Sequence, residues 1–181
     1  SLTIEAVNAL TAAQVSVLSP AQLLALSTQQ IRAISSQGIA ALSGAQISKL
    51  RNDQIAALTV GNDAQLGSTN PQGPDQVGAL SSTQMQSLRM DQVAALTSQQ
   101  MRSLSSTQLN ALSLKQMQSV DLQDIAALTT GQISALKVAD IAELTSAQVG
   151  ALGTQQVAVL SSAQVSALSV AQLLALSTQQ I

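Results

Sequence analysis

The chain has 181 residues, of which 46% are hydrophobic, yet it contains no Phe, Tyr, Trp, His or Cys. Without His or Cys there is no ligand set for a soft metal, haem or an iron–sulfur cluster, and without aromatics there is no stacking surface for bases or sugars. Seven basic and nine acidic residues provide no patch of positive charge, and the longest apolar runs are too short to span a bilayer. We therefore expect no metal site, no cofactor, no nucleic-acid partner and no membrane insertion.

A large aliphatic residue returns every eight residues along most of the chain. These residues are Leu10, Leu18, Leu26, Ile34, Leu42, Leu50, Leu58, Leu80, Leu88, Leu96, Leu104, Leu112, Val120, Leu128, Leu136, Leu144, Leu152, Leu160, Leu168 and Leu176. The consensus of each eight-residue repeat, or octad, is Leu-Ser/Thr-x-x-Gln-Ile/Val-x-Ala. Internal repetition at a fixed period is typical of a stacked-repeat architecture.

Each octad carries the signature of a helix start. In a capping box the side chain of an N-cap Ser or Thr accepts from the N3 amide, and the N3 side chain accepts from the N-cap amide. Ser161 and Gln164 have this spacing, and the aliphatic residues on either side of them suit a hydrophobic staple. Pro20 and Pro74 fall at N1, where a missing N–H costs nothing. The pattern predicts one short helix, of about six residues, in every octad.

Two other folds fit an eight-residue period less well. In one continuous helix the leucine column would advance by about 80° per octad and would never form a stripe. A β-solenoid suits an even period, but Ala, Gln and Leu favour helix.

The residue after the N4 aliphatic, here called N5, defines two alternating classes of octad. We expect N5 to be mostly buried in the first class and mostly exposed to solvent in the second. In first-class octads N5 is Asn8, Leu24, Ala40, Ala56, Gly78, Ala94, Asn110, Ala126, Ala142, Ala158 and Leu174. In second-class octads it is Ser16, Arg32, Ser48, Gln86, Arg102, Gln118, Ser134, Gly150 and Ser166. We interpret the unit as a 16-residue pair of helices, and the fold as an all-α solenoid that continues as one rod over residues 1–181.

The octads are interrupted once, between Leu58 and Leu80. The two-class alternation survives the interruption, which indicates one octad lengthened by the polar stretch Thr59–Gln72. We expect a longer surface loop at residues 59–72. Asn62 and Asp63 would allow a calcium loop instead, but the alternating acidic pattern of such a loop is absent.

Charged residues gather at the starts of first-class helices. They are Arg51 with Asp53, Arg89 with Asp91, Asp121 with Asp124, and Lys137 with Asp140. Together they would make a charged docking face, although carboxylates in a first helical turn are already favoured by the helix dipole. Asp121 and Asp124 resemble an acid–base pair without a nucleophile or a pocket, so we expect no catalytic residue and no enzymatic activity.

Two repetitive features suit a binding surface. The glutamine column would present identical polar groups to a glycan or to ice, although capping accounts for the same residues. The N1 positions of first-class octads form a second candidate, an apolar stripe that either packs within the stack or receives a partner. Its residues are Ile4, Pro20, Pro74, Met90, Leu122, Val138 and Val170.

The octad consensus resembles the Leu-Ser/Thr-x-x-Gln-Ile/Val-x-Ala arrays of very large bacterial surface or secreted proteins, often beside RTX-type or adhesin-like regions. The resemblance covers nearly all of the chain except Thr59–Gln72. It implies a stalk, spacer or scaffold outside the cytoplasm; the alternative is a binding or adhesion module for a protein, glycan or ice. Leu176–Ile181 repeats Leu26–Ile31, which suggests either an excerpt from a longer array or a deliberately repeated sequence. Neither end carries a polar capping repeat, so we expect end-to-end self-association.

Overall fold

The computed structural model describes residues 2–58 and 76–180, which fall in two compact units, Ser1–Leu96 and Thr97–Ile181. Within these residues the chain forms short α-helices and no strand, so the predicted all-α class is confirmed. The predicted loop at 59–72 and the N1 residue Pro74 lie outside the described residues, and continuity over 1–181 stays a prediction.

The first unit contains α1 (Ile4–Asn8), α2 (Ala12–Ser16), α3 (Pro20–Leu24), α4 (Thr28–Ala33), α5 (Ser36–Ala41), α6 (Gly44–Ile47), α7 (Asn52–Ala57), α8 (Ser82–Ser87) and α9 (Met90–Ala94). The second contains α10 (Ser98–Ser103), α11 (Ser106–Leu109), α12 (Leu114–Gln118), α13 (Leu122–Ala127), α14 (Thr130–Ala135), α15 (Val138–Ala142), α16 (Ser146–Gly150), α17 (Thr154–Ala158), α18 (Ser162–Ser166) and α19 (Val170–Ala175).

The capping boxes predicted from the octads form in most of these helices. At α18 the amide of Gln164 donates to Ser161 Oγ at 3.2 Å, and the amide of Ser161 donates to Gln164 Oε1 at 2.8 Å. Several helices have the next aliphatic of the octad column as their C-cap. The C-cap of α14 is Leu136, whose φ of −63° and ψ of 142° are extended. The column residue therefore turns the chain from one helix to the next, and we call this position the junction residue.

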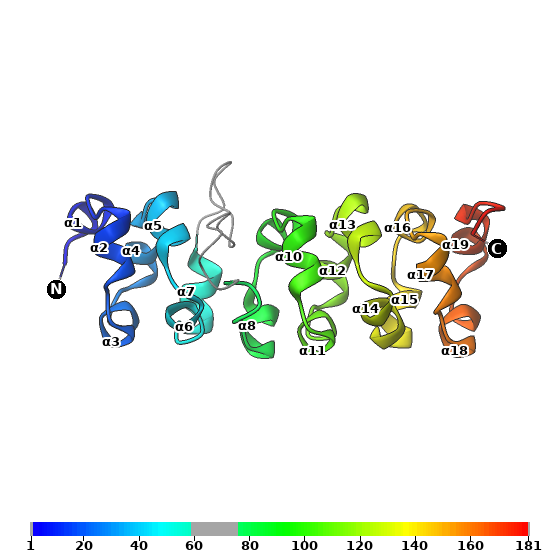
Figure 1. Cartoon of the computed structure of the whole chain (residues 1–181). Coiled ribbons are helices and arrows are strands. Elements are labelled where there is room, and N and C mark those ends of the chain that lie inside the picture. Colours follow the sequence, from blue (N-terminus) through cyan, green and yellow to red (C-terminus); the bar gives the residue numbers. More distant parts are fainter. Residues whose placement is uncertain (1, 59–75, 181) are drawn as a thin grey trace. The chain divides into compact units, whose positions relative to one another are not determined.

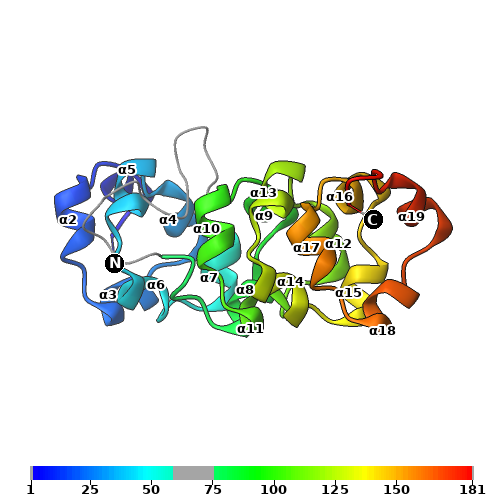
Figure 2. The same cartoon turned by 45° about the vertical axis from the view of Figure 1, so that its right-hand side comes forward.

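Helices stack on helices three octads away within each unit. In the first unit, contacts between helices join α1 to α4, α2 to α5 and α4 to α7, and also α7 to α8 when the lengthened octad is counted. In the second unit they join α10 to α13, α13 to α16 and α16 to α19, which follow one another along one edge in Figure 1. They also join α11 to α14, α14 to α17, and α15 to α18, the last pair being clear in Figure 2. Three octads therefore make one turn of the superhelix.

This result confirms the repeat-solenoid arrangement and corrects the size of its turn. The alternation of octads predicted stacking in units of two helices. The observed step of three is odd, so each helix stacks on a helix of the other class. At the contact of α16 with α19, Gly150 is the N5 residue of its octad, and a Cβ there would lie 3.0 Å from the carbonyl oxygen of Ala175. The alternation of the two octad classes therefore pairs unlike helix surfaces between successive turns.

The core follows the N4 and junction columns through both units. Ile31, Met101 and Ile141 at N4 are fully buried, and the junction residues beside them are nearly so. Met85, Met101 and Met117 occupy N4 in second-class octads and are buried there, where a flexible side chain suits an irregular core.

Candidate functional site: the glutamine column

The glutamine at N3 joins two successive turns of the solenoid. Gln148 is 1% exposed, and its Oε1 accepts from the amide of Thr145 at 3.0 Å, which completes the local capping box. Its Nε2 donates to the carbonyls of Met117 at 3.0 Å and Val120 at 2.9 Å, at a junction in the preceding turn. One side chain thus satisfies backbone groups at the start of its own helix and near the end of another.

The same pairing recurs along the chain. Glutamines that donate to a carbonyl 28 residues earlier are Gln30, Gln46, Gln54, Gln132, Gln148, Gln156, Gln164, Gln172 and Gln180. After the interruption, Gln76, Gln84 and Gln92 donate to carbonyls 34 and 37 residues earlier instead. The six additional residues are the length that the interruption adds to two octads. The hydrogen bonds therefore join the same octad positions, the N3 glutamine with an N4 and a junction carbonyl, on either side of the interruption.

This lattice answers a physical need of very short helices. The first four N–H groups and the last four C=O groups of any α-helix lack partners within the helix, and in helices of four to six residues these are nearly all the groups. The sequence predicted the capping role of the glutamines but not the bond to the earlier turn, because nothing in one octad shows which junction lies beside it. The inner glutamines are buried and bonded, which leaves their amides turned away from any external ligand.

Three basic residues at N-cap positions extend the lattice. Arg51 donates to the carbonyl of Leu24, and Lys137 Nζ donates to the carbonyl of Asn110 at 2.6 Å, each 27 residues earlier. Arg89 donates to the carbonyl of Ala56, 33 residues earlier across the interruption. These side chains replace the usual Ser or Thr cap, and no side-chain cap forms at their own helices. They bind the N5 carbonyl of an earlier helix instead.

The predicted charged face is therefore largely engaged in local contacts. Arg51 Nε lies 3.1 Å from Asp53 Oδ1, and Arg89 Nη2 lies 2.9 Å from Asp91 Oδ2, in two exposed ion pairs. The hydrogen bond from each arginine lowers the pKa of its aspartate below the ordinary value. Exposed pairs of this kind contribute little to stability.

Two aspartates stand where the lattice would have a glutamine. Burial raises the pKa of Asp124, against a hydrogen bond of 2.6 Å from Ser98 Oγ, while the nearby Asp121 carboxylate raises it further. Burial also raises the pKa of Asp140, although the charge and the amide of Lys137 lower it. Asp140 Oδ2 is buried with no hydrogen-bond partner.

The difference between the two aspartates follows from the turn below them. Ser98 lies 26 residues before Asp124, and the residue at the same distance before Asp140 is Leu114, which has no hydroxyl. Asp121 and Asp124, considered above as an acid–base pair, occupy an exposed N-cap and a buried N3 position that is already bonded to Ser98.

The described N1 residues of the apolar stripe are exposed, and consecutive members lie on different helix columns. Ile4, Pro20, Met90, Leu122, Val138 and Val170 are all accessible. Because columns repeat every third octad and the stripe uses every second one, its consecutive members do not stack on one another. They are thus available as separate apolar positions, and their role in binding stays a prediction.

Comparison with known proteins identifies one family model. The model described as the ALTTAQ repeat matches residues 25–60 and 125–162, which agrees with an array of repeats. No curated protein and no solved structure matches the chain. In the part of the chain that the structure describes, no helix is long and apolar enough to cross a membrane.

Proposed function

We propose that this chain is a non-catalytic structural repeat segment, a stalk, spacer or scaffold, of a larger bacterial surface or secreted protein. The observation that carries the proposal is the lattice itself. The N3 glutamine, which is the most frequently repeated polar side chain, forms hydrogen bonds that hold successive turns together. The two matches to the ALTTAQ repeat support the repeat nature of the segment.

A spacer has a property that a compact domain lacks, which is a length that grows with the number of repeats. We would place the chain between two fluorescent domains and add copies of a six-octad segment of its second unit, residues 129–176. Energy transfer is expected to fall steadily with each copy. An unchanged transfer efficiency would contradict the spacer proposal.

The proposed location, at the cell surface or outside the cell, rests on the resemblance of the octads to arrays in such proteins. An antibody against the chain is expected to label intact cells that carry the parent protein. Labelling that requires permeabilised cells would contradict this location.

A binding or adhesion module is the second candidate, favoured by the exposure of Met90 (54%) and Val170 (74%). A triple variant, Met90→Ser, Val138→Ser and Val170→Ser, removes apolar groups that contribute little to the core. A protein or glycan captured by the immobilised chain and lost in the variant would support a module. Equal capture by both forms would favour the spacer.

A further inference from the structure

One contact between turns of the second unit lacks its glutamine. Asp140 holds the N3 position of α15, one octad after Gln132 and one octad before Gln148. Those two glutamines donate to junction carbonyls 28 residues earlier, at 2.7 and 2.9 Å. The junction carbonyl at the same separation from Asp140 is that of Leu112, and an ionised carboxylate has no proton to donate to it. Within the described residues, Asp140 Oδ2 is itself buried without a hydrogen-bond partner. We call the contact between α15 and residues 109–118 of the preceding turn the α15 contact.

The helices at the α15 contact also meet less closely than those beside them. α14 packs on α11 and α16 packs on α13, whereas the contact between α15 and α12 is sparser than either of these. On its other side α15 packs on α18. The weakly packed side of α15 is thus the side on which the glutamine bond is missing.

Exposed hydrogen bonds join the two turns at the α15 contact. Asn110 Oδ1 accepts from the amide of Lys137 at 3.1 Å, and Asn110 Nδ2 donates to the carbonyl of Ala135 at 2.8 Å. Lys137 Nζ donates to the carbonyl of Asn110 at 2.6 Å. Gln118 Nε2 donates to the carbonyl of Glu143 at 2.9 Å. Water replaces exposed bonds of this kind when the turns separate, so they oppose opening only weakly.

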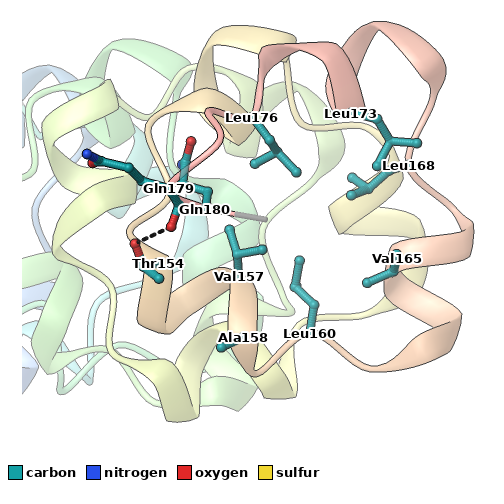
Figure 3. Close-up of a pocket in the computed structure, with 10 residues that line it drawn as sticks. All are labelled: Thr154, Val157, Ala158, Leu160, Val165, Leu168, Leu173, Leu176, Gln179 and Gln180. Carbon is teal, nitrogen blue, oxygen red and sulfur yellow. Dashed lines mark hydrogen bonds between the residues drawn. The ribbon is translucent and has the colours of Figure 1, made fainter.

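Elsewhere in the unit an exposed bond accompanies the glutamine bond. Figure 3 shows such a place, where Thr154 Oγ1 donates to the carbonyl of Gln179 at 3.2 Å. The next residue, Gln180, donates from Nε2 to the carbonyl of Leu152, in the same turn as Thr154. The α15 contact has the exposed kind of bond without the glutamine bond.

We propose that the second unit opens first at the α15 contact, so that a solenoid under load separates there while its other turns stay folded. Opening returns the Asp140 carboxylate to water, and burying a charge is costly unless it is fully paired. Opening at the contacts of Gln132 or Gln148 instead breaks buried hydrogen bonds, which costs more free energy. The inference goes beyond the spacer proposal, because it names the place at which the chain lengthens first.

Hydrogen exchange resolved by residue tests the proposal on three matched amides. Ile133, Ile141 and Val149 hold the N4 positions of α14, α15 and α16 and are fully buried. Each amide donates to the carbonyl of its own N-cap residue at 3.0 or 3.1 Å. Because their local surroundings match, their exchange rates compare the opening of the three contacts. The amide of Ile141 is expected to exchange about tenfold faster than each of the other two.

Two variants move the defect. Asp140→Gln places a donor opposite the carbonyl of Leu112 and is expected to slow the exchange of Ile141 to the rate of Val149. Gln148→Asp shifts the defect by one octad and is expected to speed the exchange of Val149 about tenfold, with circular dichroism showing that the variant is folded.

Glu143→Gln is the matched control, since it removes an exposed charge from the end of the same helix and should leave all three amides as they are in wild type. A wild-type Ile141 amide that exchanges no faster than its two counterparts would overturn the proposal. So would an Asp140→Gln variant in which Ile141 keeps its wild-type rate. Uniform exchange along the unit would leave the spacer function standing, because length that scales with repeats does not depend on where the chain opens.

Discussion

The side-chain amide of a buried N3 glutamine serves as donor and acceptor at once, and few other residues could replace that glutamine. Glutamate would keep the capping oxygen and lose the donor, and asparagine is one methylene shorter. A glutamine on the inside of a protein is costly unless its polar atoms are bonded. Here the cost is offset because the groups it bonds would themselves be orphans.

Gln148→Ala tests the value of one such side chain. It leaves the amide of Thr145 and the carbonyls of Met117 and Val120 without their partners, so we expect a loss of about 3 kcal/mol in unfolding free energy. Thr145→Ala, which removes only the cap, is expected to cost about 1 kcal/mol. Gln155→Ala, at an exposed site of α17, is the control and should have little effect. Denaturant titration measures all three, and equal losses for Gln148→Ala and Thr145→Ala would refute the bond between turns.

Asp140→Gln should stabilise the protein at neutral pH. The folded-state pKa of the Asp140 carboxyl lies above the ordinary value of 3.8, so the protonated form of Asp140 favours folding. That contribution is fully present below pH 3.8 and is lost as the pH rises through the folded-state pKa. A glutamine has no charge to bury and would face the carbonyls of Leu109 and Leu112, as Gln148 faces those of Met117 and Val120 one octad later.

We expect Asp140→Gln to gain about 1 to 3 kcal/mol at pH 7, with the gain shrinking towards pH 4. Glu143→Gln removes the same charge from an exposed site and is the control. Unfolding free energies measured across this range decide the matter. A gain that is constant with pH would show that burial of the charge is not the cause.

At the scale of the element, the helices differ in how closely they approach their neighbours. Gly38 takes the N3 place in α5, and a Cβ there would lie 2.8 Å from Ile34 Cγ2 and 3.1 Å from Val15 Cγ2. It lets α5 press against α2. Gly131, at N2 of α14, has open space where a Cβ would lie, and the one neighbouring atom is Thr129 Oγ1 at 3.9 Å.

Alanine at these two glycines should therefore have opposite effects. Gly38→Ala is expected to destabilise the protein by about 1 to 3 kcal/mol through crowding. Gly131→Ala is expected to stabilise it by about 0.5 to 1 kcal/mol, because alanine favours helix. Thermal unfolding of the two variants provides the comparison, and a stabilised Gly38→Ala would show that α2 can move away at no cost.

Much of this element structure is readable from the octad. Ser161, Gln164 and the aliphatics beside them predict where a helix begins, because capping depends on spacing within a few residues. The number of octads per turn is not readable in that way, since it depends on how sharply the chain bends at each junction residue. The roles of Arg51, Arg89 and Lys137 were missed for the same reason. The sequence separations of these residues from Leu24, Ala56 and Asn110 indicate the contacts, but only once the number of octads per turn is known.

At the scale of the whole molecule, the turn of three octads sets the size of the unit that unfolds. Interactions in a solenoid are mostly between neighbouring turns, so the chain should unravel stepwise under force. Each turn released is expected to lengthen the chain by about 80 Å at full extension. Single-molecule pulling measures the step, and steps near two-thirds of that length would indicate two-octad units instead.

The odd stacking step also governs how such a chain changes length. Adding two octads preserves the alternation, so every helix still meets one of the other class. Adding a whole turn of three would set like against like at the seam. The segment that can be duplicated without harm is thus two-thirds of a turn, and each such duplication rotates everything after it by a third of a turn backwards. A chain that lengthens by duplication therefore has its exposed residues redistributed around its axis, while the contacts between its turns stay the same.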